Sequence, residues 1–194
     1  MTRKMLMTDA EPVFHYEASQ EDRHLVLAGE ITSETMVQLA AFIGHFDHAE
    51  PGEEDAQGPD LWLTLNLEGG DVYAMFAMVD IIRSYPGKIH VKAVGMVWSA
   101  AILLVASCTG ERKAGKHTVF MVHRIESRPE KILPTTLELE KDELMRLSNY
   151  WADAMTEVTK RPREFWEQLA IKTSKDYFIS ANDAVGFGIV DSLL

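Results

Sequence analysis

The sequence predicts an α/β fold in which strands and helices alternate along one domain. Short apolar runs rich in β-branched residues alternate with longer segments whose apolar residues recur at helical spacing. Of the 194 residues, 46% are apolar and 25% are charged, which suits a single substantial core. Strands that alternate with helices usually pair in parallel. We therefore expect a mainly parallel sheet covered by helices.

The first half of the chain supplies three strand–helix pairs. Strands are predicted at 24–29, 61–67 and 89–97, and the helices that follow them at 31–46, 72–85 and 99–107. Thr32 or Ser33 can cap the first helix, and Glu34 places a negative charge in its first turn. Pro86-Gly87 ends the second helix. The acidic, Pro- and Gly-containing stretch 49–60 is predicted to be a loop.

The second half is predicted to continue with one more strand and then mostly helix. The predicted elements are a strand at 117–123, a long helix at about 135–160, a short helix at 163–170, and a final strand, helix and strand within 176–194. Ser180 or Asn182 can cap the last helix. Residues 1–20 lack periodicity, so we expect a flexible arm there and a single domain over 21–194.

The long helix carries an apolar stripe that needs a surface to cover. The stripe consists of Leu137, Leu144, Leu147, Trp151, Ala154, Met155 and Val158. A helix of this length extends about 38 Å, which is longer than a domain of this size can bury against its own core. We therefore expect part of it to be buried between subunits.

Charge and cysteine content exclude several classes of partner. Thirty acidic residues against nineteen basic ones give a net charge of −11, which opposes binding to nucleic acid or to anionic membranes. The single cysteine, Cys108, rules out an intrachain disulfide framework. The N-terminal stretch has no apolar signal region, so a cytoplasmic location is expected.

Residues 93–110 contain no charge and place Ser99 between an apolar strand and an apolar helix. Eighteen such residues meet the approximate length of a membrane span. Glycines and hydroxyl residues dilute the stretch, and a β-branched strand leads into it, so a buried strand entering a buried helix fits better. Ser99 can cap a helix beginning near Ala100 or act as a nucleophile, and these residues alone leave both roles open.

Other polar residues give weaker signals. Gly69-Gly70 lies between a strand and a helix, where it can form a tight turn or bring backbone N–H groups to a ligand. His123 ends an apolar strand at its carboxyl end, the edge at which open α/β sheets bind ligands. His45 and His48, with Asp47 between them, have metal-compatible spacing but no third ligand, so no metal site is expected.

Taken in order, these motifs resemble the family of the Clp protease proteolytic subunit, ClpP. The motifs are the Glu68-Gly69-Gly70 turn, Gly95-x-x-x-Ser99, the strand ending at His123, the long helix, and the C-terminal KDYFIS and AVGFGIVD. The resemblance covers about residues 22–194. It implies the ClpP/crotonase fold of repeated strand–helix units with a protruding handle helix, here about 135–160. It also implies that handles interleave between two stacked heptameric rings.

The resemblance also implies a catalytic role for each matching residue. Ser99 would be the nucleophile, His123 the general base and Asp176 the carboxylate that orients the imidazole. Gly70 and Ala100 would donate the oxyanion-hole N–H groups. This division follows serine chemistry, because a hydroxyl is a weak nucleophile until a histidine accepts its proton.

Some positions depart from the ClpP pattern near the expected cleft. Glu68 stands where the family generally has proline, Trp98 and Ala100 replace other residues beside the serine, and Arg124 follows the histidine in place of glutamine. We expect Glu68, Gly69, Trp98 and Arg124 to contact substrate. An acidic Glu68 and a bulky Trp98 would favour basic or small side chains.

The main functional hypothesis is a self-compartmentalised serine endopeptidase acting on unfolded polypeptides or peptides. It would need no cofactor of its own, and ATP would be used only by an AAA+ unfoldase partner. The alternatives are a phage head-maturation protease, suggested by the Gly-Gly-Asp-Val opening of the 72–85 helix, and a non-catalytic ring subunit. An acyl-CoA enzyme of the crotonase fold would use similar glycine turns but would not explain Ser99, His123 and Asp176.

Overall fold

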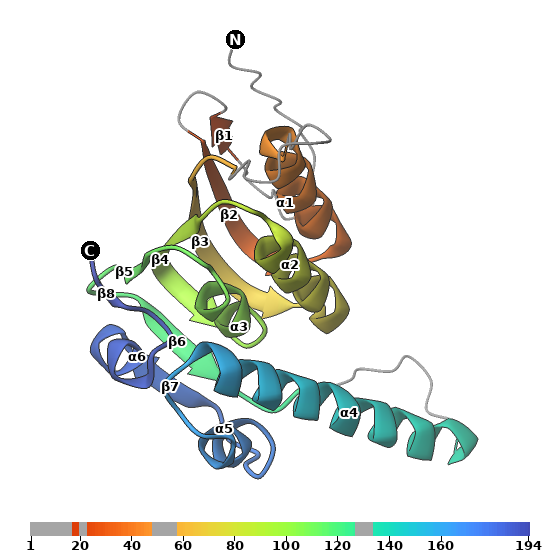
Figure 1. Cartoon of the computed structure of the whole chain (residues 1–194). Coiled ribbons are helices and arrows are strands. Elements are labelled where there is room, and N and C mark those ends of the chain that lie inside the picture. The colour runs from red at the N-terminus through yellow and green to blue at the C-terminus, as the bar shows by residue number, and fades with distance from the viewer. Residues whose placement is uncertain (1–16, 20–22, 48–57, 127–133) are drawn as a thin grey trace, which may run out of the picture.

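The structure is a computed structural model that describes residues 17–19, 23–47, 58–126 and 134–194 (Figure 1). Its elements in chain order are β1 Glu17–Ser19, β2 His24–Ile31, α1 Ser33–Phe46, β3 Leu61–Gly70, α2 Val72–Ser84, β4 Ile89–Trp98, α3 Ala101–Ala106, β5 Arg112–Ala114, β6 Val119–Val122, α4 Pro134–Val158, α5 Arg163–Ala170, β7 Tyr177–Ser180, α6 Ala181–Phe187 and β8 Ser192–Leu193. The predicted α/β architecture is confirmed.

The sheet is mostly parallel. Its described strands follow the order β1-β2-β3-β4-β5-β8, while β6 pairs with β4 and with β7. Only β1 with β2 and β6 with β7 are antiparallel among these pairs. Strand β4 therefore has two different neighbours on its outer side, β5 along its first half and β6 along its second. This change of neighbour brings the carboxyl ends of β4 and β6 together.

Polar side chains cap the starts of α1, α2 and α6, and the caps of α1 and α6 are among those that the sequence predicted. Thr32 caps α1 in a reciprocal pair of hydrogen bonds with Thr35, whose backbone N–H donates to Thr32 Oγ1 over 3.3 Å. Asp71 caps α2 by accepting from the Ala74 N–H over 2.7 Å, and Ser180 caps α6. Gly188 ends α6 in the left-handed region, with φ 80°, as glycines do after helices.

The core lies between the sheet and the helices α1, α2 and α3, which cover one face of β2, β3 and β4 (Figure 1). Alternate residues of β3 point into it, and Leu61, Leu63, Leu65 and Leu67 are all fully buried. The residues between them, Trp62, Thr64 and Asn66, lie on the other face and are only half-buried. This alternation assigns one face of the central strands to the core.

Part of the predicted N-terminal arm is a strand. Glu17–Ser19 form β1, which pairs with His24–Val26 of β2. Backbone pairing along an edge strand needs no apolar side chains, which explains why periodicity did not indicate it. The rest of the arm, together with 20–22, lies outside the described residues.

Helix α4 covers the core with its C-terminal half and extends beyond the sheet with its N-terminal half (Figure 1). Leu147, Trp151 and Met155 are buried, whereas Leu137 is 52% exposed within the chain. The predicted stripe therefore packs against this chain only in part.

Helix α4 also contacts α2 through polar side chains. The Tyr73 hydroxyl donates to Glu143 over 2.5 Å, and Arg146 forms an ion pair with the same carboxylate. The hydrogen bonds from Arg146 and Tyr73 hold the pKa of the Glu143 carboxyl at about 2. These contacts join the middle of α4 to α2.

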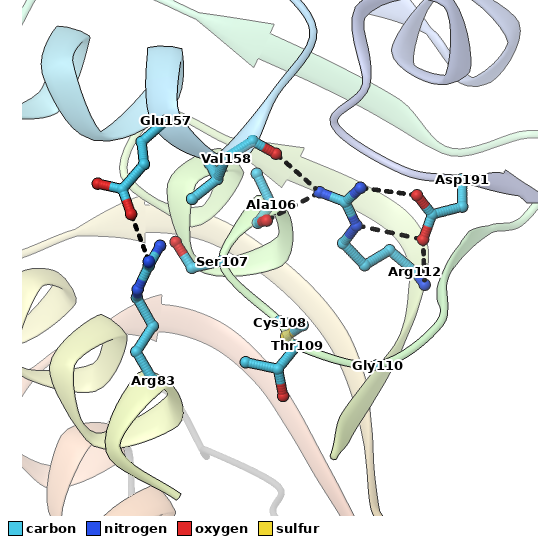
Figure 2. Close-up of a pocket in the computed structure, with 10 residues that line it drawn as sticks. All are labelled: Arg83, Ala106, Ser107, Cys108, Thr109, Gly110, Arg112, Glu157, Val158 and Asp191. Carbon is cyan, nitrogen blue, oxygen red and sulfur yellow. Dashed lines mark hydrogen bonds and ion pairs between the residues drawn. The ribbon is translucent and has the colours of Figure 1, made fainter.

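Arg112 connects three distant parts of the chain, as Figure 2 shows. Its guanidinium forms a two-pronged pair with Asp191, donating over 2.6 and 3.2 Å. The same group donates to the Ala106 carbonyl at the end of α3 and to the Val158 carbonyl at the end of α4. Because helix C-termini leave carbonyls unpaired, a single side chain satisfies two helix ends at once.

No helix in the described part of the chain combines the length and the apolar character that crossing a bilayer requires.

Leu65 of β3 gives a direct test of this core. We expect Leu65→Ala to lower the free energy of unfolding by about 2–5 kcal/mol, because a fully buried leucine is replaced by a cavity. Urea unfolding followed by circular dichroism measures the change. Val37→Ala, on a residue of α1 that is 58% exposed, is the control and should cost less than about 0.5 kcal/mol. Equal losses in the two variants would contradict the assigned core.

Candidate active site

Ser99 occupies a strained turn between β4 and α3. Its φ of 55° lies in the left-handed region, which non-glycine residues rarely adopt. The Ser99 N–H donates to the Met121 carbonyl of β6 over 2.7 Å, and the Ser99 carbonyl accepts from the Ile102 N–H. A backbone of this kind persists only where its surroundings enforce it, and such turns cluster at active sites. A sharp strand-to-helix turn of this type also presents a nucleophilic serine in other hydrolases.

His123 lies directly against Ser99. Its Nε2 is 2.7 Å from Ser99 Oγ, and both side chains are half-buried. The β4–β6 ladder explains the meeting: Trp98 pairs with Met121, so the residues that follow both strands emerge at the same edge of the sheet. A histidine at this distance can accept the serine proton.

The helix-cap interpretation of Ser99 is wrong. Helix α3 begins at Ala101, and Ala100 occupies the capping position without a side-chain hydrogen bond. The hydroxyl of Ser99 contacts His123 instead. The Ser99 hydroxyl therefore faces a histidine at the end of β6 and does not cap α3.

Gly69 and Gly70 bring the end of β3 beside this serine. Both have positive φ, 96° and 139°. A Cβ on Gly69 would lie 2.7 Å from Ser99 Cβ, and one on Gly70 would lie 2.3 Å from the Ile31 carbonyl oxygen. Only glycine fits either position. The predicted turn is the last part of β3, and its backbone passes next to Ser99.

Asp176 immediately precedes β7, opposite the end of β6. The antiparallel register pairs Val122 with Tyr177, so one further step would place Asp176 across from His123. Side chains directly opposite in such ladders have Cβ atoms about 5 Å apart. Asp176 is exposed, and among the described residues no hydrogen bond joins it to His123. The structure thus brings Ser99 and His123 into contact, and the β6–β7 register places Asp176 at the same end of the two strands.

The residues predicted to contact substrate differ in their exposure to solvent. Glu68 and Arg124 are exposed. Trp98 packs its ring edge-on against Phe178, with centroids 6.3 Å apart. Phe178, which is 59% exposed, was not anticipated, because only the β6–β7 register, in which it pairs with Met121, brings it here.

Other candidate groups do not compete with Ser99. Burial raises the pKa of the Cys108 thiol to about 12, so this cysteine stays protonated and is a poor nucleophile. The described residues contain no cluster of three metal-ligand side chains, and His48 of the His45/His48 pair lies outside them. A hollow of about 500 Å³ is lined by Ser107, Arg112 and their neighbours (Figure 2), at the opposite end of α3 from Ser99.

The chain that carries the Ser99–His123 contact matches a known protein family. The Clp protease family model matches residues 9–194. The chain belongs to the Clp protease family. It is 26% identical to the ATP-dependent Clp protease proteolytic subunit 1 of Prochlorococcus marinus (strain MIT 9312), covering 95% of this chain and 91% of the relative. It is 28% identical to proteolytic subunit 2 of Prochlorococcus marinus (strain MIT 9313), over 89% and 82% of the two chains.

Gly69 offers a test of how tightly β3 supports Ser99. We expect Gly69→Ala to slow the reaction of Ser99 with a fluorophosphonate about 100-fold, because the added Cβ displaces the serine and misplacements of ~1 Å have effects of this size. Labelling rates measured by mass spectrometry check it. Gly186→Ala is the matched control, since its added Cβ would meet nothing within 4 Å. Unchanged labelling in Gly69→Ala would rule out the close packing.

Proposed function

We propose that this protein is a ClpP-type serine endopeptidase that hydrolyses peptide bonds of unfolded proteins or peptides. The observation that carries the proposal is the 2.7 Å contact between Ser99 Oγ and His123 Nε2 at a strained strand-to-helix turn. Membership of the Clp protease family supports the same reaction. A serine and a histidine, the nucleophile and base of a serine peptidase, lie 24 positions apart in sequence and meet at the edge of the sheet where α/β folds bind ligands.

In the proposed mechanism, Ser99 Oγ attacks the carbonyl carbon of the scissile bond while His123 accepts the hydroxyl proton. The N–H groups of Gly70 and Ala100 stabilise the negative charge on the carbonyl oxygen. His123 then gives its proton to the leaving amine, which departs and leaves an acyl group on Ser99. Water, deprotonated by His123, hydrolyses this ester and restores the serine.

Asp176 completes the proposed triad by orienting the imidazole of His123 and stabilising its protonated form. The register that continues from Val122–Tyr177 supports this role. In the proposal, the Asp176–His123 hydrogen bond forms when substrate binds or the subunits assemble. Hydrogen bonds of catalytic groups are often incomplete in the free protein.

The proposed protein works as a homo-oligomer of two stacked heptameric rings that enclose the serines. The protruding half of α4 supports this assembly, because Leu137 and Leu139 are 52% and 70% exposed against the described residues of one chain. The relatives are named as proteolytic subunits of an ATP-dependent protease. We therefore propose a cytoplasmic protease with an AAA+ unfoldase as partner and sole user of ATP, without nucleic-acid or membrane binding.

The alternative functions draw less support from the geometry. Asp71 of the Gly-Gly-Asp-Val motif caps α2, so helix capping alone accounts for the feature that suggested a phage maturation protease. A non-catalytic ring subunit would not need a serine held in a strained backbone against a histidine. An acyl-CoA enzyme would likewise not require this pair.

The catalytic assignment can be tested with a fluorophosphonate probe. We expect labelling of the wild type at Ser99 and none in Ser99→Ala, while His123→Ala should be slowed by at least about 1,000-fold, since the base is lost. Intact mass spectrometry of the assembled protein measures the modification. Asp176→Asn should retain labelling but at a rate well below that of the wild type.

Two controls make the result decisive. Ser107→Ala removes a buried hydroxyl from the other end of α3 and should label like the wild type. Size-exclusion chromatography shows whether each variant keeps its assembly. A wild-type oligomer that does not react would instead support the non-catalytic subunit.

The cleft residues predict substrate preference. We expect Glu68→Pro to reduce the preference for basic side chains up to about fivefold, because an exposed ion pair contributes ~0.2–1 kcal/mol. Trp98→Ala should admit larger side chains by removing the ring that packs on Phe178. Profiling with a peptide library measures both, and Glu164→Gln, which removes an exposed charge from α5, is the control. Identical profiles in all four proteins would refute these roles.

A further inference from the structure

Strand β4 contains a bulge just before the segment that ends at Ser99. On β3 the register pairs Leu65 with Ala93 and then Leu67 with Val97. One residue of β3, Asn66, therefore stands opposite three residues of β4, at 94–96. Bulges are uncommon in parallel pairs, and they re-aim the strand that follows them.

The bulge lies where β4 changes neighbours. Before it, residues 91–93 pair with β5, and from its last residue, Met96, onward, residues 96–98 pair with β6. Two extra residues let the second half of β4 turn toward a different strand. The register of this second half against β6 then decides where Ser99 emerges relative to His123.

The side chain of Asn66 fills this bulge. Its Oδ1 accepts a hydrogen bond from the Met96 backbone N–H over 3.0 Å. The same oxygen lies 2.7 Å from where a Cβ on Gly95 would stand, and Gly95 has a φ of 64°. The Asn66 amide thus occupies the space that the missing side chain of Gly95 leaves. It also provides an acceptor for the Met96 N–H at the point where the bulge separates β4 from the backbone of β3.

We propose that Asn66 is a positioning residue that fixes where Ser99 lies along β4 relative to His123. It does so by accepting a hydrogen bond from the Met96 N–H across the bulge. It touches neither substrate nor the reacting atoms, and it acts through residues 96–98. The inference rests on the proposed function, because it assigns Asn66 a role in the reactivity of Ser99. A hydrogen-bond acceptor of the right length at position 66 is the required feature.

Two substitutions separate the acceptor from the volume of the side chain. Asn66→Leu keeps a similar size and removes the acceptor, whereas Asn66→Asp keeps an oxygen in the same place. Asn66→Ser, whose hydroxyl is too short to reach Met96, serves if the leucine variant does not fold. Thr64→Val is the matched control, since it removes a hydrogen bond to His24 from the same face of β3, two residues away from the bulge.

The readouts are the rate of fluorophosphonate labelling at Ser99 and the kcat and KM for a peptide substrate, on the full assembled chain. We expect Asn66→Leu to lower labelling and kcat at least about tenfold with little change in KM, because misplacement of the nucleophile affects the chemical step. Asn66→Asp should stay within about threefold of the wild type. Amide hydrogen exchange over 94–99 should speed up in Asn66→Leu and not in Thr64→Val.

The outcomes are distinguishable. Labelling of Asn66→Leu, or of Asn66→Ser, at the rate of Thr64→Val would overturn the inference, and so would an Asn66→Asp variant as slow as Asn66→Leu. A wild type that never labels would overturn the proposed function instead. In that case unchanged exchange over 94–99 in Asn66→Leu would still disprove that Asn66 holds the bulge.

Discussion

The register of β4 against β6 is the constraint on which the site depends. Trp98 pairs with Met121, and the Ser99 N–H bonds to the Met121 carbonyl over 2.7 Å, so the serine turn is attached to the strand that carries His123. Parallel strands end at a common edge, and this pairing converts two residues far apart in sequence into neighbours. The strained φ at Ser99 is stabilised by the same bond.

The helices and glycines around this ladder keep it in place from both sides. Helix α3 follows the turn immediately and is buried along its whole length, so the backbone after Ser99 has little freedom to shift. On the other side, Gly69 approaches Ser99 so closely that a methyl group would not fit. The backbone before and after Ser99 is therefore closely packed on both sides.

Periodicity and turn residues predicted most elements, because β2, β3, β4 and the helices α1, α2 and α4 have strong apolar patterns. The three-residue strands β1 and β5 carry too little pattern to be seen. The apolar strands before Ser99 and His123 placed each residue at a strand end, and the resemblance to the Clp protease family paired the two in advance. Asn66 and Phe178 could not, since their positions depend on a bulge and on an antiparallel register that the sequence does not reveal.

Arg112 makes the base of α4 and the C-terminal strand one mechanical unit. Its guanidinium holds the ends of α3 and α4 and the carboxylate of Asp191 together, while β8 pairs with β5 beside it. Because one guanidinium bonds both helix ends and Asp191, a shift of the C-terminal end of α4 relative to α3 would have to stretch or break these hydrogen bonds. Helix α3 starts two residues after Ser99, so these bonds hold the far end of the helix that follows the serine turn.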